Sequence, residues 1–210
     1  MKKIISLLIA LSCVFALFSC DESPIDSFAQ IVSSSEPTKI ITLTSYNDGK
    51  NSLTGRYETQ LFGSDFVMDC EYETYQIPSP GLDENEFIKS VPVTVYYRDG
   101  LYSTDGGATW SAQVPSETAM QFELNLASGK LKDYKISTDG KTLTATVSAE
   151  DTEAVLGTKL SADEDGVSIR IVHDGKSLRQ IYISYVTENE GQVSYETSYS
   201  YAEIQSPFAE

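Results

Sequence analysis

The chain has 210 residues, with 15 lysines and arginines against 31 aspartates and glutamates, which gives a formal net charge of −16. This acidity argues against binding to nucleic acid, whose phosphate backbone needs basic contacts, and against docking onto anionic lipid headgroups. One histidine and three cysteines leave few residues for a metal site, so we predict neither a metal nor another cofactor.

The N-terminus carries Lys2 and Lys3, followed by an apolar run over residues 4–18 and a small residue. This layout is typical of a secretory signal. The stretch from Leu17 to Cys20 resembles the bacterial lipobox, in which the new N-terminal cysteine is lipidated. The alternative is an uncleaved transmembrane anchor, but a spanning helix needs about 20 apolar residues and this run is shorter.

The lipobox resemblance implies three parts: a signal peptide over 1–19, a lipidated cysteine with a short tether over 20–23, and a single β-rich domain over 24–210. Acyl chains such as palmitate on Cys20 would hold the protein on the extracytoplasmic side of a membrane, in the cell envelope. Cys70 is then the one remaining cysteine, so no intramolecular disulfide is expected.

A short helix is predicted directly after the tether. Ser23 suits the N-cap, Pro24 suits the first helical position, and Asp26 occupies the acidic position of a capping box. The apolar residues that follow at helical spacing are Ile25, Phe28, Ala29 and Val32. The alternative is that residues 21–38 form a disordered linker.

From residue 39 onward, short alternating segments are separated by turn residues at roughly 8–12 residue intervals, as in one large antiparallel sheet. Residues 116–131 fit either a helix or a strand, and we favour a helix because the sheet needs an element to cover it. A second short helix is predicted over 148–156, closed by Gly157. The predicted fold class is α+β, mostly antiparallel β, with a large curved sheet covered by a few short helices. The predicted strands are 40–46, 53–62, 66–73, 91–97, 101–103, 134–137, 142–147, 167–173, 179–187 and 192–202.

Residues for catalysis are scarce. His173 precedes a predicted turn at 174–175, which favours a turn-flanking role over that of a catalytic base. The sequence lacks the nucleophile elbow, the zinc-binding histidine pair and the phosphate-binding glycine loop of common enzyme classes. Residues 163–166 distantly suggest a calcium loop but lack further oxygen ligands. We therefore predict no catalytic residue and no enzymatic activity.

Residues 103–110 match the Asp-box, Ser-x-Asp-x-Gly-x-Thr-Trp, which recurs in sialidase-like propellers. Asp105 can accept backbone N–H bonds in the turn, Gly107 can supply a positive φ, and Trp110 can anchor the hairpin on the core. One copy cannot build a propeller. We therefore interpret Ser103, Asp105, Gly107 and Trp110 as a structural hairpin, with a glycan-binding role for an exposed Trp110 as the alternative.

The order of elements, with a Tyr-Tyr hairpin at 96–102 running on to Trp110, resembles the LolA/LolB and LppX/LprG-like lipoprotein superfamily. In that family a curved sheet forms a half-barrel closed by helices, and its concave side holds lipid acyl chains or other apolar ligands. The resemblance implies a non-enzymatic, membrane-anchored protein that binds or carries a lipid or other apolar ligand. Ordinary core packing is the competing role for the candidate lining residues, which are Phe66, Met68, Tyr72, Val93, Val95, Tyr97, Ile181, Ile183 and Tyr185.

A second hypothesis from another class is a surface-interaction or scaffolding lipoprotein with a solid core and no ligand cavity. It predicts a filled interior and a contiguous exposed apolar patch, for example from the alternate tyrosines of residues 192–202. The sequence does not identify a protein partner for such a surface.

Overall fold

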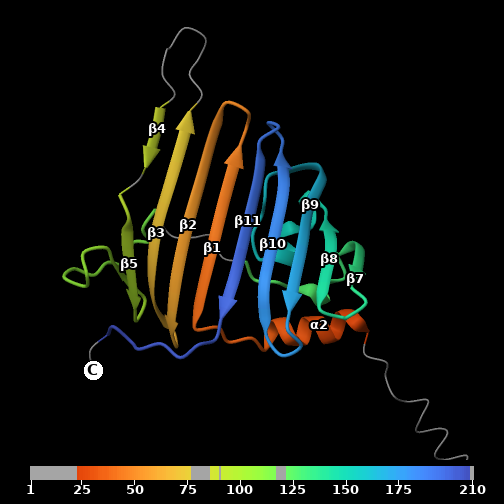
Figure 1. Ribbon diagram of the computed structural model, residues 1–210, viewed down its shortest axis with the longest axis horizontal. Coiled ribbons are helices and arrows are strands. Elements are labelled where there is room, and N and C mark those ends of the chain that lie inside the picture. Colours follow the sequence, from red (N-terminus) through yellow and green to blue (C-terminus); the bar gives the residue numbers. More distant parts are fainter. Residues whose placement is uncertain (1–22, 77–85, 90, 117–121, 209–210) are drawn as a thin grey trace, which may run out of the picture.

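The computed structural model describes residues 23–76, 86–89, 91–116 and 122–208, which form strands, two α-helices (α2 and α3) and two 3-10 turns (η1 and η2) (Figure 1). No helix in these ranges is long and apolar enough to cross a membrane. The elements are α2 (Pro24–Ser33), β1 (Lys39–Asn47), β2 (Asn51–Phe62), β3 (Asp65–Gln76), β4 (Glu86–Lys89), β5 (Val93–Arg98), β6 (Leu101–Ser103), η1 (Leu126–Ser128), β7 (Lys132–Ile136), β8 (Thr142–Val147), η2 (Ala149–Asp151), α3 (Thr152–Leu156), β9 (Ala162–His173), β10 (Leu178–Thr187) and β11 (Gln192–Ser200).

The described strands form one antiparallel sheet in the order β6-β5-β3-β2-β1-β11-β10-β9-β8-β7, with β4 paired to the far end of β3. Its two halves join where the first strand, β1, pairs with the last, β11, from Lys39 opposite Ser200 to Asn47 opposite Gln192. The two edge strands β6 and β7 do not meet, so the sheet is curved and unclosed (Figure 1). The predicted α+β half-barrel with few short helices is confirmed.

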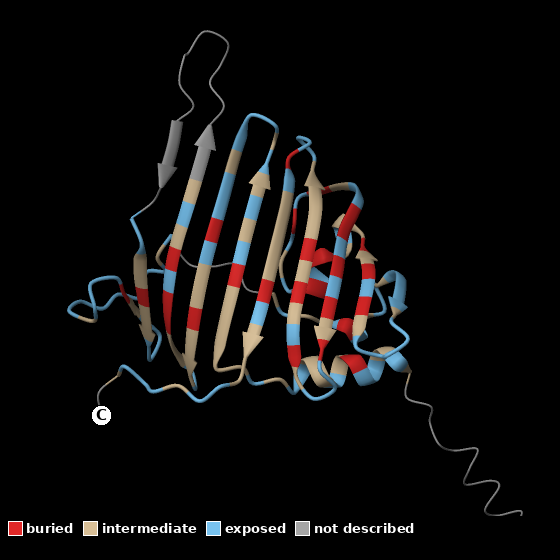
Figure 2. Ribbon diagram, in the orientation of Figure 1, coloured by how far each residue is buried: buried red, intermediate tan, exposed pale blue. Residues whose placement is uncertain are grey.

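The hydrophobic core lies on one face of β8, β9 and β10, where α2 and α3 cover the sheet. In Figure 2 the buried residues are concentrated in this half of the molecule. Along β9, Val167, Ile169 and Ile171 are buried while the residues between them are not. Phe28 of α2 and Leu156 of α3 close this layer. Each such side chain contributes about 1.5–3 kcal/mol on burial, so this half is the stable part of the domain.

Helix α2 forms as predicted. The Ser23 hydroxyl accepts a hydrogen bond from the Asp26 N–H at 3.3 Å, and the Asp26 carboxylate accepts one from the Ser23 N–H at 3.3 Å. This reciprocal capping box satisfies two N–H groups that a helix start leaves unpaired. Phe28 is buried, and Ile25 and Val32 pack against the core beside it. Residues 23–35 are therefore an ordered wall of the domain, not a linker.

The helix predicted over 116–131 is wrong for the part of that segment that the structure describes. Residues 122–125 belong to no helix or strand, and only the short turn η1 follows. Their backbone bonds to the end of α3 instead, with the Glu123 N–H donating to the Leu156 carbonyl at 3.0 Å and the Asn125 N–H to the Val155 carbonyl at 2.8 Å. These contacts satisfy the last carbonyls of a helix, so a tertiary partner decides the conformation of this segment.

The second predicted helix is shorter than expected. Residues 149–151 form the turn η2, and α3 follows it. Ser148 donates its hydroxyl to the Asp151 carboxylate at 2.6 Å and makes no capping bond to the helix backbone. Gly157 ends α3 in the left-handed conformation with φ of 72°, as predicted.

Candidate functional site

The predicted lining residues lie on the face of the sheet that carries the core. The strand register demonstrates this, because Met68 of β3 pairs directly with Val95 of β5. A second row runs from Ile183 of β10 through β11, β1 and β2 to Tyr72 of β3. Since directly opposed residues share a face, β3, β5 and β10 all present their predicted residues to one side.

Most of these residues are packed rather than open to a ligand. Met68, Val95 and Ile183 are buried core side chains, and Tyr185 packs against the core. The Phe66 ring stacks on Tyr97 with centroids 4.9 Å apart, and Tyr97 in turn contacts Tyr102 at 4.9 Å. The competing role in core packing therefore describes them better than ligand lining does.

Between the sheet and the end of α2 lies a hollow of about 550 Å³, here called the α2 pocket. Ile181 is the one predicted lining residue among the side chains that form it. Its volume falls within the roughly 300–1,000 Å³ of small-molecule sites, and its walls are mainly apolar. The apolar lining residues are Val32, Pro37, Ile40, Leu61, Phe122, Leu124, Leu178, Ile181 and Tyr199.

One wall of the α2 pocket is the segment 122–125, which Gly157 allows to approach α3. A Cβ atom at Gly157 would lie 2.8 Å from the Cβ of Glu123, closer than real side chains come. The carboxylate of Glu123 and the amide of Asn125 are the polar groups that this segment adds to the apolar lining. The wall therefore depends on a residue without a side chain.

Buried tyrosines lie on the part of the sheet beneath this wall. Burial raises the pKa of Tyr199 far above its ordinary value. Burial also raises the pKa of Tyr195, and the neighbouring Tyr185 hydroxyl adds to the shift. The Phe122 ring meets Tyr195 edge to face, with centroids 5.1 Å apart. These phenols stay neutral at physiological pH, so the floor adds no charge that would repel an apolar ligand.

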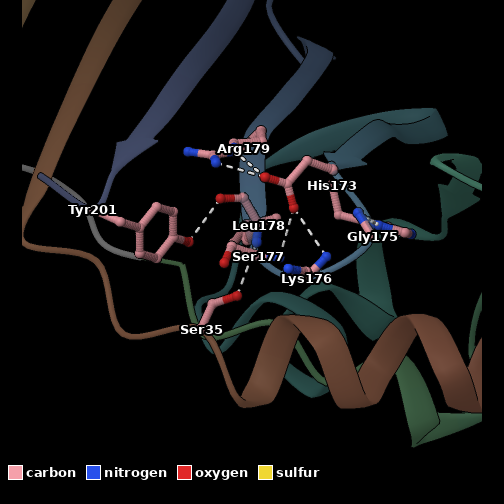
Figure 3. Close-up of polar contacts among 9 residues, drawn as sticks. Ser35, His173, Gly175, Lys176, Ser177, Leu178, Arg179 and Tyr201 are labelled. Carbon is pink, nitrogen blue, oxygen red and sulfur yellow. Dashed lines mark hydrogen bonds and ion pairs between the residues drawn. The ribbon is translucent and has the colours of Figure 1, made fainter.

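The α2 end of the pocket is fastened to the β9–β10 turn (Figure 3). The Ser35 hydroxyl accepts a hydrogen bond from the Leu178 N–H at 2.8 Å and donates one to the Ile31 carbonyl at 2.7 Å. The Tyr201 hydroxyl donates to the Leu178 carbonyl at 2.7 Å, so both backbone groups of Leu178 are engaged from the side. The pocket rim thus joins α2, β10 and the segment after β11.

Asp174 organises the turn beside this rim. Its carboxylate accepts backbone N–H bonds from Lys176 and Ser177, each at 2.9 Å, and side-chain bonds from Arg179 at 2.9 and 2.5 Å. The two backbone bonds and the guanidinium hold the pKa of Asp174 well below its usual range. These hydrogen bonds fix the conformation of the turn.

His173 lies beside this turn, as predicted, and its ring is occupied on both sides. Nδ1 accepts the Gly175 N–H at 2.8 Å, and Nε2 lies 3.1 Å from the Gly140 carbonyl, to which it donates. The ring also packs edge-on against Phe28, with centroids 4.5 Å apart. These contacts describe a structural histidine between two turns.

A smaller hollow of about 200 Å³ lies on the same face, over β1, β2 and β3. Tyr57 and Tyr72 line it together with Ser116 of the segment after the Asp-box. Tyr72, a predicted lining residue, is 37% exposed here. This hollow is small for a ligand site and adds a secondary surface beside the α2 pocket.

The Asp-box forms a self-contained hairpin. Asp105 accepts the Thr109 N–H at 2.9 Å and the Thr109 hydroxyl at 2.6 Å, while Ser103 accepts the Gly107 N–H at 2.9 Å. Gly107 has φ of 87°. Trp110 is 37% exposed and donates its indole N–H to the Gly107 carbonyl at 3.0 Å. The indole therefore packs on the hairpin's own glycine instead of on the core.

Sequence reasoning missed the residues that create the α2 pocket. Phe122 and Leu124 alternate along the chain, which was a strand-like signal within the segment assigned to a helix. Tyr199 was placed in an alternating strand as part of a candidate exposed patch, not as part of a pocket. Pro37 follows α2 and belongs to the wall only because α2 folds back onto the sheet.

Comparison with known proteins does not place the chain in a family. No family description matches the sequence, and no curated protein matches it. Among solved structures, a redesigned β-barrel, mFAP1, bound to DFHBI matches with 12% sequence identity and a TM-score of 0.21, over 81% of this chain and 96% of that one. A likeness at this level says nothing about what the present chain binds.

Proposed function

We propose that this protein is a membrane-anchored, extracytoplasmic lipoprotein of LolA-like type that binds a lipid or another apolar ligand without enzymatic activity. The observation that carries the proposal is the apolar α2 pocket of about 550 Å³ between the open sheet and α2. Each methylene group moved from water into such a pocket contributes about 0.8 kcal/mol. An acyl chain would therefore gain affinity along its length.

The position of the lipobox supports the same proposal. Two residues separate Cys20 from Ser23, the N-cap of α2. The ten residues of α2 rise about 15 Å from its first turn to the pocket wall. Acyl chains on Cys20 would therefore keep the pocket close to the bilayer, where a lipid ligand is at hand.

The proposal assigns no reaction to the polar groups around the α2 pocket. Both ring nitrogens of His173 are taken up by turn backbone, and the Ser35 hydroxyl is engaged as donor and acceptor. We therefore assign no reaction to His173 or Ser35, because a serine nucleophile is commonly activated by an adjacent base and both groups are engaged elsewhere.

The test is a binding measurement with the apolar dye N-phenyl-1-naphthylamine on the Cys20→Ser full chain, which cannot carry acyl chains of its own. We expect saturable fluorescence enhancement that palmitate competes away. Leu124→Trp fills the α2 pocket and should abolish the signal. Val91→Trp, at a residue 82% exposed and outside the pocket, is the matched control and should retain it. Equal dye binding by both variants would show that the dye does not bind in the α2 pocket and would contradict the proposal.

A surface-interaction module remains the second candidate, because Leu53 and Tyr72 are exposed on the half of the face that no described helix covers. The alternate tyrosines of β11 do not support it, since Tyr195 and Tyr199 pack against the core. A protein without dye or lipid binding that still captures a defined cell-surface protein would favour this candidate.

A further inference from the structure

The face of the sheet opposite the core carries a row of hydroxyl side chains in exact cross-strand register. Each member is directly opposite the next, over six adjacent strands from β2 to β8. The row consists of Thr54, Ser45, Ser194, Ser184, Ser168 and Thr146. Because adjacent strands are about 4.8 Å apart, the row is about 24 Å long.

This row forms the floor of a groove. A hollow of about 560 Å³ extends over its β8 to β1 portion, and a hollow of about 400 Å³ continues it over β1 to β3. Ser45 lines both hollows, so they adjoin. The next row, two residues along each strand, is taller and forms one bank. It consists of Arg56, Leu43, Glu196, Tyr182, Arg170 and Thr144.

The six hydroxyl groups are available to a ligand. None of them has a hydrogen bond to another described residue. On the core face, by contrast, the hydroxyl groups of Thr42 and Thr197 bond to each other at 3.1 Å. A hydroxyl both donates and accepts, so the floor can bond to a partner of either polarity.

The bank of the groove adds an aromatic surface. Tyr182 lies under the Arg170 guanidinium, whose central carbon is 5.5 Å from the ring centroid. This cation–π contact restrains the ring. A restrained tyrosine beside a hydroxyl floor offers an apolar ring and hydrogen-bonding groups together.

A bulge in β9 supplies carboxylates at one end of the groove. The β9–β10 register shifts between Val167 and Ala162, and Asp163 and Asp165 of the bulge line the hollow. Gly166, with φ of 77°, makes the bulge possible, because a Cβ there would collide with the Val147 carbonyl. Bulges commonly direct side chains at functional sites. Negative charge here repels anionic ligands.

We propose that this groove binds a neutral, extended oligosaccharide lying across the strands. The hydroxyl row has no charged member and suits a polyhydroxylated ligand, the strand spacing is close to the length of one sugar ring, and Tyr182 can pack against an apolar sugar face. Beside the row, Arg56, Glu71 and Glu73 also line the hollow over β1 to β3. An extended peptide is less suited, because peptides add to the edges of sheets through backbone bonds. The site lies on the face opposite the α2 pocket and is independent of the lipid-binding proposal.

The test is calorimetric titration of the full chain with maltohexaose, cellohexaose, xylohexaose and mannohexaose, with hexagalacturonate as the anionic comparison. At least one neutral hexasaccharide should bind and hexagalacturonate should not. The double variant Ser184→Ala, Ser194→Ala removes two central hydroxyls and should weaken binding about thirtyfold, since each hydrogen bond contributes on the order of 1 kcal/mol.

A blocking variant and its control locate the site. Ser184→Arg should abolish binding, while Ser198→Arg, on the same face of β11 but outside both hollows, should leave it unchanged. Circular dichroism verifies that each variant folds. The proposal is overturned if none of the four neutral sugars binds, or if binding survives Ser184→Arg. It is also overturned if the protein prefers hexagalacturonate or a neutral decapeptide, or if Trp110→Ala alone removes binding.

Discussion

Gly157 affects both the local backbone conformation and the α2 pocket. Its φ of 72° favours glycine, and its missing side chain leaves room for Glu123. Gly140 also has φ of 72° but has no atom within 4 Å of where a Cβ would stand. A comparison of the two glycines therefore separates the need for a left-handed backbone from the need for space beside Glu123.

We predict that Gly140→Ala costs about 1–2 kcal/mol in unfolding free energy, from the left-handed conformation alone. Gly157→Ala should cost more, because Glu123 must also move, and it should weaken dye binding in the α2 pocket. Urea denaturation and dye titration measure the two effects. Equal losses of stability would show that the close approach of Glu123 has no energetic consequence.

Asp105 gives the Asp-box hairpin a dependence on pH. Hydrogen bonds from the Thr109 side chain and backbone, and then from Ser103, lower the pKa of Asp105 from 3.8 to about 2. A carboxylate with a lowered pKa in the folded state stabilises fully above its unfolded pKa and loses that contribution as the pH falls. The stability advantage of the native protein over Asp105→Ala should therefore be constant above about pH 5 and shrink between about pH 4 and 2. Chemical denaturation across this range measures it, and a difference independent of pH would contradict it.

At the scale of elements, the join between α2 and the β9–β10 turn decides whether the pocket keeps its shape. Ser35→Ala removes the acceptor for the Leu178 N–H and should destabilise the protein by about 1–3 kcal/mol, because a buried donor is left unsatisfied. Ser34→Ala, which loses an exposed 3.4 Å bond within the helix, should cost clearly less. Hydrogen exchange at the Leu178 amide should accelerate in the first variant and not in the second.

The sequence predicted elements where local signals and tertiary contacts agree. The capping residues Ser23 and Asp26 and the alternation of β9 and β10 are local patterns, and both were confirmed. Residues 122–125 carry local signals for both a helix and a strand, and their backbone bonds to the carbonyl groups of α3 instead, so their conformation could not be read from the chain. The shared face of β3, β5 and β10 was also predictable in part, because alternation gives the face of each strand.

The pocket was not predictable in the same way. Alternation does not give the order of strands in a sheet, and the α2 pocket depends on β11 lying between β1 and β10. The hydroxyl row has the same origin. Ser45, Ser168 and Ser184 look like ordinary solvent-facing residues in the sequence and become a row only through the register of the sheet.

At the scale of the whole molecule, the resemblance of residues 17–20 to a lipobox predicts where the protein resides. Cys20→Ala should move the protein from the membrane fraction to the soluble extracytoplasmic fraction, because acyl chains anchor by about 0.8 kcal/mol per buried methylene. Cys70→Ala, at a buried position of β3, is the control and should stay membrane-bound. Persistence of the Cys20→Ala protein in membranes after an alkaline wash would contradict lipidation as the anchor.

The pairing of β1 with β11 has a consequence for how the protein is made. Lys39 finds its partner Ser200 near the other end of the chain, and contacts of such sequence separation slow folding. During synthesis, β1 presents an unpaired edge until the last strand emerges. Unpaired edges recruit other chains, so we expect the nascent protein to depend on a holding chaperone until its C-terminus is released.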